Sequence, residues 1–174
     1  IKLRRAGARD LPILFAWRQN AEVVRWLPSF KPITREQHIT WWRNRRHRTD
    51  YMVLVQLDNQ AWRPIGTAHA TDLDGVPEVG ILLGDTSAWG RGVGKRAIAL
   101  LLQRPEVRRN ERLIALIHPE NVASPHVFIR NGFHKVGEGW RNGQWGYEWH
   151  RAGWVEETPT ADHMVHRTVT AEDA

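Results

Sequence analysis

The segment "SAWGRGVGKRAIALLL", Ser87–Leu102, places three glycines (Gly90, Gly92 and Gly94) within five residues, directly before an apolar helical pattern. Glycine weakens the interior of a helix, but in front of a helix it lets backbone N–H groups turn outward and approach a ligand closely. A helix N-terminus offers unpaired donors and partial positive charge, which suit an anion such as phosphate. A single G-x-G is more often only a tight turn, so the choice between a turn and an anion site depends on the rest of the chain.

The segments around this loop predict one domain of alternating strands and helices. Upstream, the expected elements are a strand over Ile1–Ala6, a helix capped by Asp10 and running to about Trp26, a helix opened by the capping-box pattern Thr34–Gln37 and running to about His47, a hairpin turning near Asp58–Gln60 with Pro64 at a strand start or bulge, and a strand over Pro77–Asp85. Downstream, the expected elements are a helix ending between Pro105 and Asn110, a strand over Arg112–Glu120, a helix over Asn121–Gly132, and two strands joined by the turn Arg141–Gln144.

This order predicts an α/β fold with a mixed sheet. Only the strand before the glycine loop and the strand after its helix are joined by a right-handed crossover, which makes the loop part of a β-α-β unit. We expect the domain to occupy residues 1–155. Residues 156–174 form a polar tail that we expect to be extended or partly disordered.

Composition and charge restrict the class of protein and its partners. The chain has 174 residues, of which 41% are hydrophobic and 25% charged, as in a globular protein. No apolar run approaches the roughly 20 residues of a membrane span, so we expect no membrane partner. The absence of cysteine is compatible with a cytoplasmic location, which we take as the expectation.

The formal net charge of +6 favours an anionic partner: a phosphorylated cofactor, a nucleotide-linked substrate or nucleic acid. The densest basic run is "WWRNRRHR", Trp41–Arg48. Such a run is more often a solvated helix end, with arginines near the last carbonyl groups, than a nucleic-acid site. We therefore do not expect nucleic acid as a partner.

A second motif, "NVASPHVFIRNGF" at Asn121–Phe133, decides the meaning of the loop. With the loop and the element order, it resembles the GNAT superfamily of acyl-CoA-dependent N-acetyltransferases over about residues 1–152. The family loop Q/R-x-x-G-x-G/A is matched by Trp89-Gly90-Arg91-Gly92-Val93-Gly94, and the family motif N-x-x-S-x-x-x-Y-x-x-x-G-F by Asn121, Ser124, Phe128, Gly132 and Phe133.

The resemblance implies the GNAT fold: a mostly antiparallel central sheet, a β-α-β unit that binds coenzyme A, and flanking helices. It implies acetyl-CoA as co-substrate and no metal. The loop amides would hold the pyrophosphate, and the strand before the loop would splay from its parallel neighbour and bind pantetheine through its main chain. Asn121 would bind pantetheine, cap the following helix, or do both. The implied coenzyme A contacts are Ile81, Leu82, Leu83, Trp89, Gly90, Arg91, Gly92, Val93, Gly94, Lys95, Asn121, Ser124 and Phe128.

Catalysis in this family is direct attack of a primary amine on the thioester, which requires a base because an ammonium group cannot attack. A glutamate on the strand before the loop has this role in many members, and Glu78 occupies that strand. Alternatively, Glu78 is an exposed glutamate at the start of a strand and has no catalytic role. Asp72, Asp74, His69 and His118 are the further candidates.

The sequence departs from the family at Phe128, where the motif has a tyrosine that commonly protonates the departing thiolate. Phenylalanine keeps the packing but lacks the O–H group. Water, Ser124, His126 or Tyr147 remain as proton donors.

The acceptor is expected to be a small-molecule amine. The segment Leu14–Trp42 resembles two branches of the family, the amino-sugar nucleotide N-acetyltransferases and the aminoglycoside 6'-N-acetyltransferases. In that resemblance Trp17, Trp26, Trp41 and Asp72 would contact the acceptor, although most tryptophans at helical spacing are core residues.

Charge separates the two branches, because a polycationic aminoglycoside needs an acidic pocket and this chain is basic, with Arg43, Arg45, Arg46 and Arg48 on the segment that borders the acceptor. We therefore expect an amino sugar or nucleotide-linked amino sugar. Protein N-terminal acetylation is a third substrate class, and a non-enzymatic coenzyme A-binding module is the remote alternative. The sequence leaves open whether the chain forms a homodimer.

Overall fold

The computed structural model describes residues 1–27, 31–71, 76–141 and 144–152, with side chains described except those of residues 139–148 and 150–152. The expected domain end at residue 155 and the tail 156–174 lie outside these residues. The strands are β1 (Lys2–Arg5), β2 (Arg48–Val55), β3 (Arg63–Thr71), β4 (Glu78–Leu83), β5 (Arg112–Ile117), β6 (His134–Arg141) and β7 (Gln144–Ala152). The helices are α1 (Leu11–Trp17), α2 (Ala21–Val24), α3 (Arg35–Asn44), α4 (Val93–Leu102), α5 (Pro105–Arg108) and α6 (Ser124–Ile129), with short 3-10 turns η1 (Ala8–Asp10) and η2 (Thr86–Ala88).

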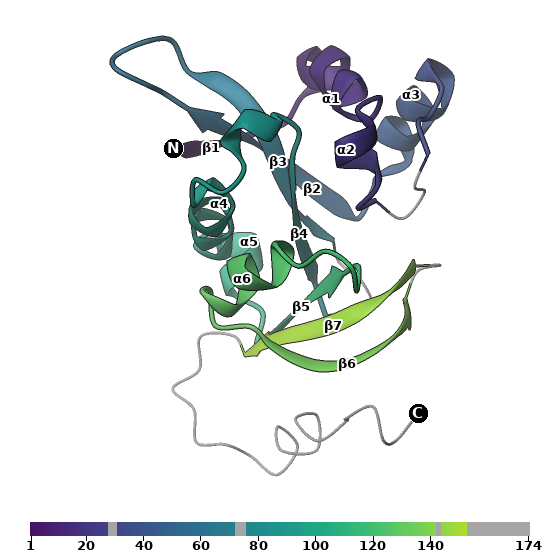
Figure 1. The fold of residues 1–174 in the computed structure, drawn as a ribbon, viewed down its shortest axis with the longest axis vertical. Coiled ribbons are helices and arrows are strands. Elements are labelled where there is room, and N and C mark those ends of the chain that lie inside the picture. The colour runs from purple at the N-terminus through teal and green to yellow at the C-terminus, as the bar shows by residue number, and fades with distance from the viewer. Residues whose placement is uncertain (28–30, 72–75, 142–143, 153–174) are drawn as a thin grey trace.

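The seven strands form one sheet in the order β1-β2-β3-β4-β5-β7-β6. Helices α1, α2 and α3 lie on one face of the β1–β4 half, and α4 lies on the other (Figure 1). Central strand β2 is buried on both faces, because alternate side chains point to opposite sides of a strand. Tyr51 and Val53 pack in the cluster that contains α4, and Met52 and Leu54 pack in the cluster that contains α1.

Every strand pairing is antiparallel except that of β4 with β5, which is parallel. This confirms the expected mixed, mostly antiparallel sheet with one β-α-β crossover. The parallel pairing consists of a single register pair, Glu78 with Ile114, and the Ile114 N–H donates to the Pro77 carbonyl at 3.0 Å. Beyond this point the two strands continue without pairing, which leaves a gap in the middle of the sheet.

The helix expected from Asp10 to Trp26 is wrong in extent, because the chain breaks between α1 and α2. Asn20 adopts an extended conformation and its side chain accepts a hydrogen bond from the Glu22 N–H at 3.0 Å, which starts a new helix. Asp10 also does not cap through its side chain. Its carboxylate instead accepts hydrogen bonds from Arg4, at 2.7 and 3.0 Å, and from the Gly7 N–H at 2.8 Å.

Other local signals are confirmed. The capping box at Thr34 and Gln37 is formed in both directions, at 3.2 and 2.8 Å, although α3 ends at Asn44 rather than His47. Pro64 sits at a register shift between β2 and β3, as expected for a residue without an N–H donor. By contrast, the single helix expected to end between Pro105 and Asn110 is wrong in extent, because α4 ends at Leu102 and Pro105 begins the separate helix α5. In the described part of the chain no helix is long and apolar enough to cross a membrane.

Candidate functional site

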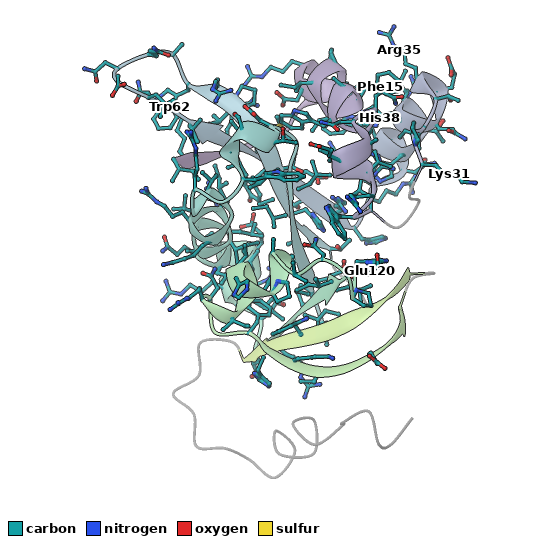
Figure 2. All side chains as sticks on the ribbon, viewed as in Figure 1. Phe15, Lys31, Arg35, His38, Trp62 and Glu120 are labelled. Carbon is teal, nitrogen blue, oxygen red and sulfur yellow. The ribbon has the colours of Figure 1, made fainter. Side chains whose placement is uncertain are left out.

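A cleft of about 830 Å³ opens where β4 and β5 diverge. One wall comes from α1–α3 and the strands they cover, and the other from the glycine loop, α4, α6 and the loop before α6. Figure 2 shows His38 on α3 near the top of the view and Glu120, in the loop before α6, below it; both residues line the cleft. The cleft therefore lies between the two halves of the sheet and is lined by residues of both.

The main chain of β4 faces this gap at every second residue. Because the Pro77 carbonyl points to β5 and backbone groups alternate along a strand, those of Val79, Ile81 and Leu83 point to the same side. The Leu83 carbonyl accepts a hydrogen bond from the Trp89 indole N–H at 3.0 Å. The main-chain groups of Leu82 point instead to β3, which corrects the expectation that Leu82 would bind through its backbone. Its side chain still lines the cleft.

The glycine loop has the geometry of an open N-terminal site. Gly90 and Gly92 both have φ of +72°, in the left-handed region, and a Cβ added at either would meet nothing within 4 Å. Gly92 is the N-cap of the ten-residue helix α4 and has no side chain to cap it. Lys95, in the first turn, lines the cleft, whereas Arg91 is exposed and outside the lining. This arrangement presents backbone donors and one cation to the cleft.

The second motif closes the cleft from the other side. The Asn121 side chain accepts a hydrogen bond from the Ser124 N–H at 3.1 Å, so the structure forms the helix-start contact that the sequence offered as one role. Phe128 lines the cleft, is only 2% exposed, and packs edge-on against Phe133 with ring centroids 5.2 Å apart. The side chain of Asn131 ties α6 to α4 through the Lys95 carbonyl at 3.1 Å.

Polar side chains line up across three strands on the face covered by α1–α3. Strand register places Arg48, Thr71 and Glu78 in one row, and Asp50, His69 and Gly80 in the next. All of these except Thr71 line the cleft. The rows lie at the closed end of the gap, because Glu78 is the residue at which β4 still pairs with β5.

The His69 imidazole lies directly on Gly80. A Cβ at Gly80 would be 2.4 Å from Cε1 and 2.7 Å from Nε2 of His69, so only glycine leaves room for the ring. Nδ1 of His69 is buried and has no hydrogen-bond partner among the described residues. Burial and the nearby positive charge of Arg48 lower the pKa of His69 well below its usual value, which keeps the ring neutral.

Arginines dominate the charge of the α1–α3 wall. Arg48 pairs with the buried carboxylate of Asp50 at 2.9 Å, and Arg45 approaches the same carboxylate at 3.8 Å while its guanidinium lies 3.3 Å from the Trp42 ring centroid. Burial, together with the charge of Arg48, lowers the pKa of Arg18, another cleft residue. The four arginines expected to face the acceptor are therefore reduced to one, because Arg48 lines the cleft and Arg43, Arg45 and Arg46 do not.

Aromatic side chains line the same wall. Trp17 lies on Gly84, where an added Cβ would be 2.0 Å from Cγ of the indole. Trp41 stacks on His38 at 5.6 Å, and Trp26 meets His118 across the cleft at 6.0 Å. We call this group (Trp17, Trp26, His38 and Trp41) the aromatic wall.

The cleft brings together most of the residues that the sequence singled out. It is lined by Glu78, Ile81, Leu82, Leu83, Trp89, Gly90, Gly92, Val93, Gly94, Lys95, Asn121, Ser124, Phe128, Trp17, Trp26, Trp41, His69, His118 and His126. Asp72, Asp74 and the side chain of Tyr147 lie outside the described residues. Sequence reasoning missed Gly80 opposite His69, Gly84 beside Trp17 of α1, and the pairing of Arg48 with Asp50 on β2. The roles of the two glycines depend on tertiary contacts with residues far away in the sequence.

Comparison with known proteins identifies the family. The model of the acetyltransferase (GNAT) domain matches residues 1–134. An uncharacterised protein of Methanocaldococcus jannaschii, MJ1062, is 31% identical over 150 residues, which are 85% of this chain but only 31% of that protein. The chain thus spans about a third of that relative. It belongs to the GNAT acetyltransferase family.

Solved structures agree on the fold. A domain from Methanocaldococcus jannaschii superposes with a TM-score of 0.76 at 30% identity, covering 84% of this chain and 96% of that domain. The aminoglycoside acetyltransferase AAC(6')-Ib in complex with coenzyme A gives 0.72 at 20% identity, covering 87% and 94%. Ribosomal-protein-alanine N-acetyltransferase from Brucella melitensis gives 0.66 at 21% identity, covering 87% and 99%.

Proposed function

We propose that the chain transfers the acetyl group of acetyl-CoA to the primary amine of a small molecule, an amino sugar or a nucleotide-linked amino sugar. One observation carries the proposal: the gap between β4 and β5 runs from the open glycine loop to the polar rows, and the aromatic wall faces it. A thioester entering from the loop would meet an amine held against the aromatic wall.

We infer a separate task for each part of the gap. Loop amides and Lys95 would hold the pyrophosphate, and the main chain at Ile81 would pair with pantetheine and polarise the thioester carbonyl. Glu78, at the closed end of the gap, would receive a proton from the acceptor through water. Phe128 cannot donate a proton, so water or His126, which is exposed at the cleft, would protonate the thiolate.

The preference for an anionic acceptor rests on Arg18 and Arg48, the two arginines of the α1–α3 wall that line the cleft, and no longer on the other arginines of the run Trp41–Arg48. Burial, and after it the charge of Arg48, lowers the pKa of Arg18, so the two cations act on the same region of the cleft. Asp50 pairs with Arg48 at 2.9 Å and with Arg45 at 3.8 Å. A phosphate or carboxylate on the acceptor would be attracted to the cations that line the cleft.

A panel assay tests the proposal. Free thiol released from acetyl-CoA is measured with amino-sugar nucleotides, aminoglycosides, polyamines and peptides as acceptors. The proposal predicts the highest kcat/KM for amino sugars or their nucleotides. Preference for an aminoglycoside or for a peptide N-terminus would assign the chain to the corresponding branch, and no turnover with any amine would favour a coenzyme A-binding module.

Glu78→Gln tests the base. We expect kcat to fall with little change in the KM of acetyl-CoA, and the loss to shrink as pH rises and more amine is neutral. A wild-type rate and pH profile in this variant would remove Glu78 from the mechanism.

Arg48→Gln tests the acceptor charge. We expect a higher acceptor KM that depends less on salt, with the KM of acetyl-CoA unchanged. Because Arg48 also compensates Asp50, the variant is compared with Arg48→Gln/Asp50→Asn, and with Arg43→Gln as an arginine outside the cleft. Tighter binding of a polycationic acceptor to Arg48→Gln would contradict an anionic substrate.

A further inference from the structure

We propose that His69, seated on Gly80, contacts the acceptor amine and takes its proton, while Glu78 only carries that proton onward. The inference deepens the proposed function and rests on it. Three observations support it: the place of His69 on β3 opposite Gly80 of β4, the glycine that makes room for its ring, and its buried Nδ1, which has no partner among the described residues.

The first observation concerns distance along the gap. His69 lies opposite Gly80, next to Ile81, whose main chain faces the gap. Glu78 is two residues further from the loop, roughly 6–7 Å along a strand. If pantetheine pairs with β4 at Ile81, the thioester lies nearer to His69 than to Glu78. An amine attacking that thioester therefore meets the imidazole first.

The second observation is that β4 is shaped to accept the ring. With any side chain at position 80 the imidazole would have to leave, since the new Cβ would overlap both Cε1 and Nε2. A structural histidine in a core would ordinarily satisfy its nitrogens. Here Nδ1 is buried without a partner among the described residues, and the residue lines the cleft. Among the described residues the ring has no partner for this nitrogen, which leaves it for a ligand in the cleft.

The surroundings of His69 favour the neutral form of the ring. Arg48 and Asp50 face it from β2 and Glu78 lies in the next row on β4, while Arg18 and Glu120 line the cleft beyond. Burial and Arg48 lower the pKa of His69, so its lone pair is available through the neutral pH range. The same low basicity lets the protonated ring release the proton quickly to Glu78 or water.

The reaction balances as follows. The ammonium form of the acceptor gives one proton to the unprotonated nitrogen of the neutral His69 imidazole, and this proton leaves through Glu78 and water. The amine lone pair then forms the C–N bond at the thioester carbon. The C–S bond breaks, the second amine proton is lost as the amide forms, and the thiolate takes up a proton from water. One proton is released to solvent for each acetyl group transferred.

The test measures thiol release from acetyl-CoA, with the panel amine that reacts fastest, in His69→Gln, His69→Ala, Gly80→Ala and the double variant His69→Ala/Gly80→Ala. His47→Gln, an exposed histidine outside the cleft, is the matched control. We expect His69→Gln to lower kcat by roughly 10²-fold, with the loss shrinking at high pH. Coenzyme A affinity, measured by calorimetry, should stay within about twofold, which checks the fold.

Gly80→Ala should lower kcat by displacing the ring, and it should cost nothing further once His69 is alanine. If the wild type is active and His69→Gln keeps the wild-type kcat, the inference about His69 is wrong and the proposed function still stands. An equal loss at every pH accompanied by lost coenzyme A affinity would also overturn the inference, because that pattern describes a structural role. A wild type inactive with every amine overturns the proposed function instead.

Discussion

Gly92→Glu puts a carboxylate at the mouth of the anion site without filling any occupied space. Gly92 has φ of +72° and ψ of 4°, and an added Cβ meets nothing within 4 Å. The only cost to folding is therefore the left-handed conformation of a residue with a Cβ, about 1–2 kcal/mol. For a domain of this size that corresponds to a melting temperature lower by roughly 2–8 °C.

Gly92→Glu also weakens coenzyme A binding, because its carboxylate repels the pyrophosphate. Two like charges about 4 Å apart repel by about 1 kcal/mol at the dielectric constant of water and about 4 kcal/mol near a protein surface. Gly90 and Gly92 are exposed and have no neighbouring atom within 4 Å of an added Cβ, so solvent reaches them and the lower part of that range applies. A penalty of about 1–2 kcal/mol weakens coenzyme A roughly 5- to 30-fold.

Calorimetric titration with coenzyme A measures this effect. Gly92→Ala carries the same backbone strain without the charge, and Gly132→Ala carries it at φ of +84° outside the cleft lining. Only Gly92→Glu should lose affinity strongly, and 1 M salt should recover part of it because the Debye length falls to about 3 Å. A folded Gly92→Glu protein that binds coenzyme A like the wild type would reduce the loop to a turn.

Three further substitutions test other parts of the structure. Phe128→Tyr adds a hydroxyl at the cleft; it should fold and change turnover by less than about tenfold, whereas a much larger gain in thiol release would mean that the natural site lacks a proton donor. Gly84→Ala forces the Trp17 ring away and should destabilise by about 1–3 kcal/mol with a raised acceptor KM; an unchanged melting temperature would contradict the packing. Burial raises the pKa of Asp10, but the hydrogen bonds from Arg4 outweigh it and hold that pKa below its usual value. The carboxylate therefore stabilises the fold above about pH 4. Asp10→Asn should cost about 1–3 kcal/mol at pH 7, and the difference from wild type in chemical unfolding should vanish in acid; a difference that persists there would reject the linkage.

Much of this arrangement could be predicted from local sequence. The capping box at Thr34 and Gln37, the bulge at Pro64 and the glycine loop are each determined by neighbours within a few residues, so a short window contains the physical cause. The crossover between β4 and β5 followed from element order. The break at Asn20 was harder, since an asparagine inside an apolar helical stripe can face solvent or start a new helix.

The centre of the cleft could not be predicted in this way. Gly80 has no special meaning in the sequence; it matters because strand register puts His69 opposite, and register depends on the whole sheet. Arg48 was missed for a different reason: it sits at the end of a basic run but pairs with Asp50, two residues along the same strand, and the burial of Asp50 depends on the whole fold. A charge count over the run could not show that a buried carboxylate holds it.

Because β4 and β5 are separated by the gap, helix packing rather than strand pairing determines the angle between the two halves of the sheet. With one register pair between them, the ladder contributes little to that angle. The halves are joined through helices, because α4 packs on the β1–β4 half and α6 on β5. At Gly94 the two helices approach so closely that an added Cβ would lie 3.2 Å from Val127. A larger residue at position 94 would push α4 and α6 apart and so widen the gap between the two halves of the sheet, where the thioester must fit. Position 94 would thus control the width of the gap from within helix α4.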